Sequence, residues 1–223
     1  MFKNILFSFA ILVSSQVVQA QDSMDKKETA KGTSVVNLYG ISFSFGMAPW
    51  VSHPKKAMTE SEYFRSNKGN QFMLEAIPKG QTFEKWKTLY AVSAIKIGRK
   101  IPLKTWEDVT LNNFKKTCTD GEFKELVRKE AVSLYQVVCP KISGPKKMGY
   151  KKKMGEVGVF AFFVVDGVLI SHYIEWRGKS FSMDNPKKWP VSQSELAKVT
   201  NLIKGAVATK GGLQVSAGDV ESN

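Results

Sequence analysis

The chain has 223 residues, of which 43% are hydrophobic and 24% charged, and its formal net charge at pH 7 is +13. This composition excludes a chain that is disordered throughout, and the length suits one domain with a proper core, with or without tails. A strongly basic surface attracts lipid headgroups, envelope polymers, acidic proteins or nucleic acid, but it identifies none of them.

The first twenty residues have the pattern of an export signal. Lys3 gives a short positive region, an apolar run follows over residues 5–13, and Val18-Gln19-Ala20 is a cleavage site of small-residue type. A membrane anchor needs about 20 apolar residues, and three polar residues interrupt this run after residue 13. We therefore expect a signal peptide over residues 1–20, a periplasmic or secreted mature chain from about Gln21, and no transmembrane segment. Loss of the single charge of Lys3 would leave +12 of the +13.

The N-terminal half begins with a polar stretch and continues with strands. Residues 21–37 show no sustained period and predict a flexible leader, so the domain is expected to begin near Leu38. Alternating serine and apolar residues over 40–46 are typical of a half-buried strand, and a further strand is expected over 71–77. Thr82 is expected to cap a short helical turn with Phe83 and Trp86 facing inward, and the residues that follow, 89–97, to form a strand.

The middle of the chain predicts a helix and a hairpin. Helical spacing of apolar residues begins after Pro102 and runs to Cys118. Two strands are then expected, over 123–129 and 131–139. In the second strand Leu134 and Val138 would share one face, and Tyr135 the other.

The C-terminal half contains the clearest hairpin of the sequence. Apolar strands over 158–165 and 168–176 are separated by Asp166-Gly167, a two-residue turn that suits hairpin twist, and their apolar content predicts the centre of a sheet. A final helix over 192–208 begins with the capping box Ser192-Gln-Ser-Glu195. Residues 210–223 are expected to be a disordered tail, which leaves one domain over residues 38–209.

The two cysteines, Cys118 and Cys139, are expected to form a disulfide. An exported chain meets an oxidising compartment, where an even number of cysteines usually means a pair. The alternative, a catalytic thiol, needs a nearby base and must escape oxidation, so the disulfide is favoured.

A basic segment is the best candidate for a binding site. Six lysines occur within thirteen residues around Tyr150, and the residues proposed to contact an anionic partner are Lys146, Lys147, Tyr150, Lys151, Lys152 and Lys153. In this hypothesis Tyr150 offers a stacking or apolar contact. The alternatives are a solvated loop or a charged edge strand that discourages aggregation.

Other polar residues carry weaker hypotheses. Glu60 and Glu62 are the carboxylates that an exported hydrolase would use. Glu107 and Asp108 are interpreted as solvated helix surface. His172 and Glu175 have metal-ligand spacing only on a helix, and on the expected strand they fall on opposite faces. The sequence therefore predicts no metal site and no cofactor.

Two further side chains complete the candidates. Trp189, in an expected loop, is the best candidate for an exposed aromatic contact, and Arg177 is expected to pair with an acid or to stack locally. Helices among hairpin-linked strands predict an α+β fold with an antiparallel sheet.

The order of these motifs carries a resemblance. The run Glu75 to Trp86, Leu134 to Pro140, Gly155-Glu156, Glu175-Trp-Arg177 and the final helix resemble small exported bacterial proteins of unknown function, with the α+β sandwich of the PsbP and Mog1 group. The resemblance covers about residues 38–209. It implies a non-enzymatic binding or assembly role and transfers no site residue.

The sequence thus favours an exported, non-enzymatic protein that binds an envelope or extracellular protein or polyanion through a basic surface. Export argues against nucleic acid as the partner. The alternatives are the hydrolase with loop carboxylates and a secreted effector that acts on a host. Nothing in the sequence predicts the partner's identity or the oligomeric state.

Overall fold

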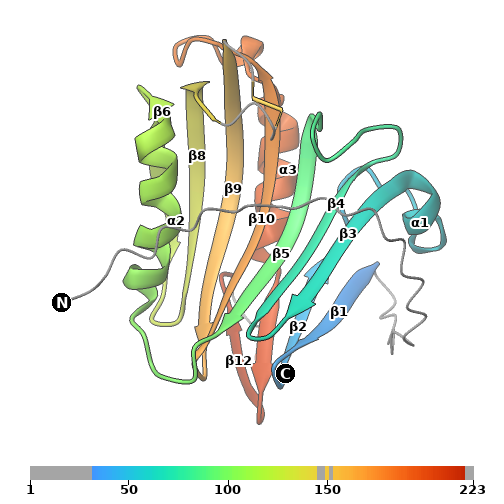
Figure 1. Cartoon of the computed structure of the whole chain (residues 1–223), viewed down its shortest axis with the longest axis vertical. Helices are drawn as coiled ribbons and strands as arrows, with labels where there is room; N and C mark the ends of the chain where they lie inside the picture. Colours follow the sequence, from blue (N-terminus) through green and yellow to red (C-terminus); the bar gives the residue numbers. More distant parts are fainter. Residues whose placement is uncertain (1–31, 145–148, 151–152, 219–223) are drawn as a thin grey trace.

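A computed structural model describes residues 32–144, 149–150 and 153–218, which form two antiparallel sheets with helices packed on them (Figure 1). The small sheet contains β1 (Thr33–Leu38), β2 (Ile41–Gly46), β11 (Val207–Lys210) and β12 (Leu213–Ser216). The large sheet contains β3 (Ser61–Lys68), β4 (Gln71–Pro78), β5 (Thr88–Lys96), β6 (Cys118–Thr119), β7 (Glu122–Arg128), β8 (Val132–Ile142), β9 (Met154–Val165) and β10 (Val168–Lys179). The helices are η1 (Pro54–Lys56), α1 (Ala57–Glu60), α2 (Leu103–Thr117), η3 (Pro186–Lys188) and α3 (Gln193–Lys204).

The large sheet is built around the predicted central hairpin. Its strand order is β3-β4-β5-β10-β9-β8-β6, with β7 paired to β8, and its neighbouring strands are antiparallel. Asp166 and Gly167 form the β9–β10 turn with φ of 46° and 71°, the left-handed conformation that a tight hairpin turn of this kind requires. The predicted α+β class with an antiparallel sheet is confirmed.

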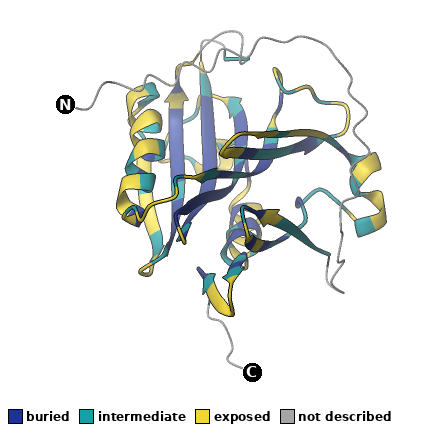
Figure 2. Cartoon of the chain, turned by 60° about the horizontal axis from the view of Figure 1, so that its bottom comes forward, coloured by how far each residue is buried: buried dark blue, intermediate teal, exposed yellow. Residues whose placement is uncertain are grey.

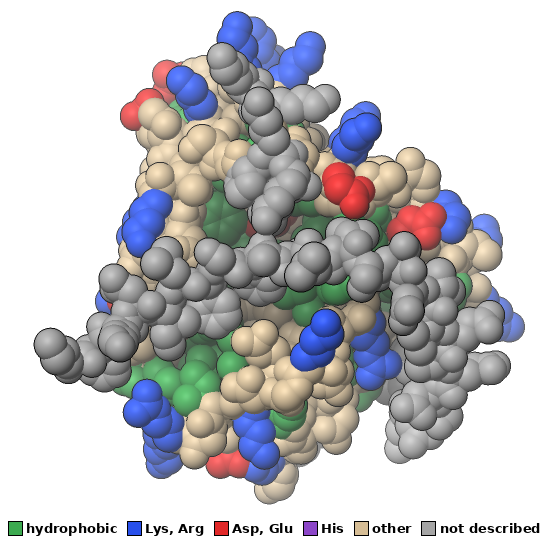
Figure 3. Space-filling view, in the orientation of Figure 1, with side chains coloured by type: hydrophobic (Ala, Val, Ile, Leu, Met, Phe, Trp, Pro, Cys, Tyr) green, Lys and Arg blue, Asp and Glu red, His purple; other side chains and the backbone are tan. Residues whose placement is uncertain are grey.

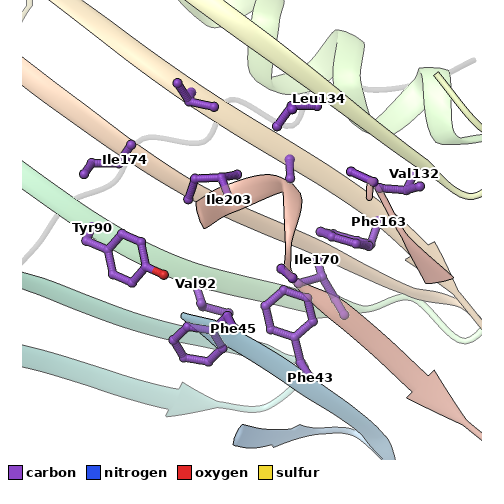
Figure 4. Packing of buried hydrophobic residues seen from close by; sticks show 14 of the residues in the cluster. Phe43, Phe45, Tyr90, Val92, Val132, Leu134, Phe163, Ile170, Ile174 and Ile203 are labelled. Carbon is purple, nitrogen blue, oxygen red and sulfur yellow. The ribbon is translucent and has the colours of Figure 1, made fainter. Parts of the chain in front are cut away.

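The main core lies between one face of the large sheet and a layer formed by the small sheet and α3 (Figure 4). Phe43 of β2 packs edge-on against Phe163 of β9, with ring centroids 5.3 Å apart. The apolar stripe of α3 is buried in the same core through Leu196, Val199 and Ile203. The predicted cap is present, since the Ser192 hydroxyl accepts from the backbone N–H of Glu195 at 3.2 Å.

Within the described residues, a helix covers only one side of the opposite face of the large sheet. There α2 buries Leu103 and Leu111 against Phe160 and Phe162 of β9. Figure 1 shows α2 beside β6 and β8, and α3 behind the sheet. Among the described elements, no helix lies along this face over β5 and β4.

The domain boundaries extend beyond the predicted ones at both ends. Residues 33–37, predicted as leader, belong to β1, which pairs with β2 along its whole length. Residues 210–216, predicted as tail, belong largely to the β11–β12 hairpin, whose turn is Gly211-Gly212 with φ of 56° and 85°. The sequence analysis missed both strands because the segments are rich in polar residues. Strands of a small sheet can be polar, since they bury only part of their surface (Figure 2). The predicted signal peptide lies outside the described residues.

The structure differs from two helix predictions. The final helix ends at Lys204 with Gly205 as its cap, so residues 207 and 208 are in β11 instead. Thr82 begins a turn, closed by its carbonyl and the N–H of Lys85, rather than a helix. Trp86 is buried as predicted, whereas Phe83 is only half-buried. None of the helices in the described ranges is long and apolar enough to cross a membrane.

Candidate functional site

The predicted basic segment is only partly described. Lys146, Lys147, Lys151 and Lys152 lie outside the described residues, and Lys153 is exposed. Tyr150 is half-buried, and its ring centroid lies 4.0 Å from the Arg177 guanidinium carbon. Its hydroxyl also donates to Glu156 at 3.4 Å.

Arg177 stacks on two aromatic rings. The guanidinium carbon lies 3.7 Å from the centroid of Trp86 as well as 4.0 Å from that of Tyr150, and its Nε donates to Glu156 at 2.6 Å. Trp86 comes from the turn before β5, and Glu156 faces Arg177 across the β9–β10 pairing. The structure therefore confirms that Arg177 pairs with an acid and stacks locally.

A groove runs beside this cluster on the outer face of the large sheet. It encloses about 180 Å³, with α2 as one wall and strands β5, β9 and β10 as its floor. We call it the outer groove, and its lining residues are Ser93, Trp106, Thr110, Phe114, Phe160, Ser171, Tyr173 and Glu175. Figure 3 shows hydrophobic side chains gathered towards the middle of this face, with Lys and Arg around its rim.

The side chains that line the outer groove alternate along β10 with core residues. Ser171, Tyr173 and Glu175 face the groove, while His172 and Ile174 lie in the main core. Period-two alternation is the ordinary consequence of strand geometry. It also confirms that His172 and Glu175 lie on opposite faces.

The Ser171 hydroxyl is a buried polar atom without a partner. The residue is 4% exposed, and its Oγ has no hydrogen-bond partner in the described structure. Buried hydroxyls normally have a partner, because an unmade hydrogen bond costs free energy. The hydroxyl is therefore free to bond to a group that enters the outer groove.

Two carboxylates on this face have raised pKa values. Burial raises the pKa of Glu75, on β4, to about 7. Burial also raises the pKa of Glu175 well above its ordinary value, and repulsion by Glu156 and Glu75 adds to this while Arg177 opposes it. Neither Glu75 nor Glu175 has a hydrogen bond or an ion pair within the described structure.

A larger hollow of about 860 Å³ lies between residues 46–55 and α3. Its charged side chains, Lys55, Glu195 and Lys198, are exposed to water. Water satisfies such groups, so this hollow lacks the unmet polar groups that mark a built site. The outer groove is the stronger candidate.

Glu60 and Glu62, the carboxylates of the hydrolase hypothesis, each have a separate local partner. Ser52 donates to Glu60 from its backbone N–H at 2.6 Å and from its hydroxyl at 2.7 Å, and these bonds lower the pKa of Glu60. Glu62 forms an ion pair with Lys79 at 2.7 Å. Neither carboxylate lines the outer groove.

The interpretation of Glu107 as solvated helix surface is wrong. Glu107 is 1% exposed and accepts two hydrogen bonds from Arg128, at 2.6 and 2.9 Å, and one from Ser133 at 2.5 Å. The buried carboxylate is stable there because an arginine from β7 reaches under α2 to neutralise it. Asp108 remains on the surface with Lys104.

The histidines have structural roles. His53 accepts from the backbone N–H of Lys55 at 3.2 Å and so caps η1. His172 is fully buried, and burial lowers its pKa to about 3. Since the Tyr90 hydroxyl donates to the Gly46 carbonyl, it accepts from Nε2 of His172 at 2.7 Å. Within the described residues, no three His, Cys, Asp or Glu side chains cluster to hold a metal ion.

The remaining sequence candidates lie away from the outer groove. Cys118 and Cys139 are at bonding distance, with sulfurs 2.11 Å apart, and link the end of α2 to β8. Trp189 is half-buried rather than freely exposed, because it packs on Phe181 and donates to the Ser182 carbonyl at 3.3 Å. Sequence reasoning missed the outer groove, although polar residues at every second position of the apolar strand β10 were its signal.

The comparisons with known proteins yield solved structures of low sequence identity. No protein-family model and no curated protein matches the sequence. A solved structure of a point mutant of the protein Mog1 is similar, with 12% identity and a TM-score of 0.46, over 76% of this chain and 90% of that one. The Ran-binding protein Mog1p of Saccharomyces cerevisiae is also similar, with 11% identity and a TM-score of 0.45, over 78% and 91%. Mog1 is part of the group named by the resemblance in the sequence.

Proposed function

We propose that this chain is an exported, non-enzymatic binding protein whose ligand occupies the outer groove. The export pattern of residues 1–20 supports a periplasmic or secreted location, and a disulfide between Cys118 and Cys139 suits an oxidising compartment.

The observation that carries this proposal is the unpartnered Ser171 hydroxyl on the floor of the outer groove. A concave, largely apolar site with a few convergent polar groups is the usual form of a ligand site. Here Ser171 and Glu175 supply the polar groups, and aromatic rings supply the apolar walls. A ligand would provide the hydrogen bonds that the folded chain leaves unmade.

Photo-crosslinking in the native cell tests the proposal. A photoreactive residue at position 110, on the groove wall, is compared with one at position 109, which is 52% exposed on the same helix. After irradiation, the protein is purified and its intact mass measured. We expect an adduct of defined mass at position 110 and none at 109. No adduct at either position, or equal adducts at both, would overturn the proposal.

The basic segment remains part of the proposal as an electrostatic surface. Lys141 and Lys153 are exposed at its two ends, where they add to local positive potential. Reversing the charges of Lys151, Lys152 and Lys153 should weaken binding to anionic vesicles and flatten its salt dependence. Unchanged binding and unchanged salt dependence would remove this surface from the proposed function.

A further inference from the structure

Acidic side chains gather at the outer groove, although the chain as a whole is basic. The chain carries +13, yet the ionisable side chains gathered around this groove include Glu175, Glu75 and Glu156. Arg177, the cation that the described residues place beside them, already bonds to Glu156 and stacks on two rings. Burial raises the pKa of Glu75 and Glu175, and a cation bound in the groove would favour their ionised form.

The walls of the outer groove are suited to a flat apolar group. Phe160 and Tyr173 are stacked, with centroids 5.2 Å apart and planes at 17°, and Phe114 packs edge-on against Phe160 at 5.2 Å. Trp106 completes the wall and is fixed by its indole N–H, which donates to the Ile170 carbonyl at 3.3 Å. Aromatic faces attract flat rings and cations alike.

Volume limits the size of the occupant. The groove encloses about 180 Å³, whereas a cavity of about 150 Å³ holds benzene. A single ring with a short side chain fits this space.

We infer that the outer groove binds a small arylalkylamine, with its ring against the aromatic side chains of the groove and its ammonium group at Glu175. The inference rests on the proposed function and names its ligand class. The ammonium donates to the Glu175 carboxylate, which lines the groove four residues along β10 from Ser171. Glu75 adds attraction from the neighbouring strands, because its charge acts on both Glu175 and Tyr173. An anionic ligand would meet the same charges as repulsion.

Three probes of matched shape test the charge requirement: phenethylamine, phenethyl alcohol and 3-phenylpropionate. Each is titrated into the full mature chain, and binding is followed by NMR shifts of Ser93, Ser171 and Tyr173. We expect saturable shifts with the amine, binding at least tenfold weaker with the alcohol, and none with the carboxylate. A tenfold difference corresponds to about 1.4 kcal/mol.

Two variants test which carboxyl group binds the ammonium group of the amine. Glu175→Gln should weaken amine binding at least tenfold and leave alcohol binding unchanged, and Glu75→Gln should weaken amine binding less. Glu62→Gln is the matched control, since this acid lies on β3, an edge strand of the large sheet, and pairs with Lys79. Alcohol binding equal to amine binding, carboxylate binding, or amine binding insensitive to Glu175→Gln would overturn the inference.

Different results would overturn the proposed binding function of the groove and the proposed class of its ligand. An adduct at position 110 together with no amine preference would overturn the ligand class and keep the groove as a binding site. Absence of that adduct would overturn the proposed function itself. Thermal unfolding of each variant, compared with the wild type, shows whether the fold is retained.

Discussion

Arg177 donates to Glu156 at 2.6 Å where both side chains are almost fully buried, at 4% and 2% exposure. Trp86 and Tyr150 stack on the guanidinium, so little water reaches the pair. The stability of this part of the sheet therefore depends on keeping both partners or removing both.

Removing Arg177 alone should be strongly destabilising. Arg177→Met leaves the Glu156 carboxylate buried without its cation, and the free energy of unfolding should fall by about 3–5 kcal/mol. The double variant Arg177→Met/Glu156→Leu should recover much of this loss. Urea unfolding measures both. Lys79→Met, in the exposed pair with Glu62, is the control and should cost about 1 kcal/mol or less. Equal losses at the two pairs would contradict the prediction.

Substitution of Glu107 and of Asp108, neighbouring acids of α2, should change the free energy of unfolding by very different amounts. Glu107→Ala removes the buried partner of Arg128, Ser133 and Tyr135 and should lower the free energy of unfolding by about 3–5 kcal/mol. Asp108→Ala, one residue away on the surface, should change it by about 0.5 kcal/mol. Chemical denaturation of the two variants side by side checks this, and a similar loss in both would show that burial of Glu107 contributes nothing.

The disulfide should stabilise the folded chain. Cys118 and Cys139 are 21 residues apart, a loop for which restriction of the unfolded chain contributes about 3 kcal/mol. Cys118→Ala/Cys139→Ala should lose about that much in urea unfolding. Adding dithiothreitol should lower the stability of the wild type by a similar amount and leave the variant unchanged. An effect of dithiothreitol on the variant would point to another cause.

Glu75 should make stability fall as pH rises. Its pKa is about 7 in the folded chain and 4.5 when unfolded, so the folded state binds more protons between these values. Stability is then lost as pH increases from about 4.5 to 7. Glu75→Gln should therefore be more stable than the wild type at pH 8, by about 2 kcal/mol after allowance for solvent screening, and equal at pH 4.

Glu60 should make stability change with pH in the direction opposite to that of Glu75. Hydrogen bonds from Ser52 lower its pKa, so ionised Glu60 stabilises the folded state above the unfolded pKa, and this contribution is lost on acidification. Glu60→Gln should be less stable than the wild type at pH 7, with the difference shrinking at low pH. Thermal unfolding across pH for both variants separates the two directions, and parallel pH curves would contradict both assignments.

Features set by neighbouring residues were predictable from the sequence. The β9–β10 hairpin follows from two apolar runs around Asp166-Gly167, and α3 follows from its cap and its apolar stripe. Each needs only contacts within about twenty residues, for which turn chemistry and periodicity are sufficient.

The outer groove was not predictable in this way. Glu75 and Glu175 are 100 positions apart, and they approach because β5 pairs with both β4 and β10. The burial of Glu107 likewise depends on Arg128, which comes from β7. Periodicity shows which face a residue occupies, but not which strands lie beside it.

The pairing of β2 with β11 joins the two ends of the domain. Ser44 lies opposite Val207, so a strand near the start of the described chain completes its sheet only with one made near the end. β1 is made before β2, but β11, its other partner, does not exist until synthesis has passed residue 210. A nascent chain consequently carries Phe43 and Phe45 without their finished sheet until β11 has been made.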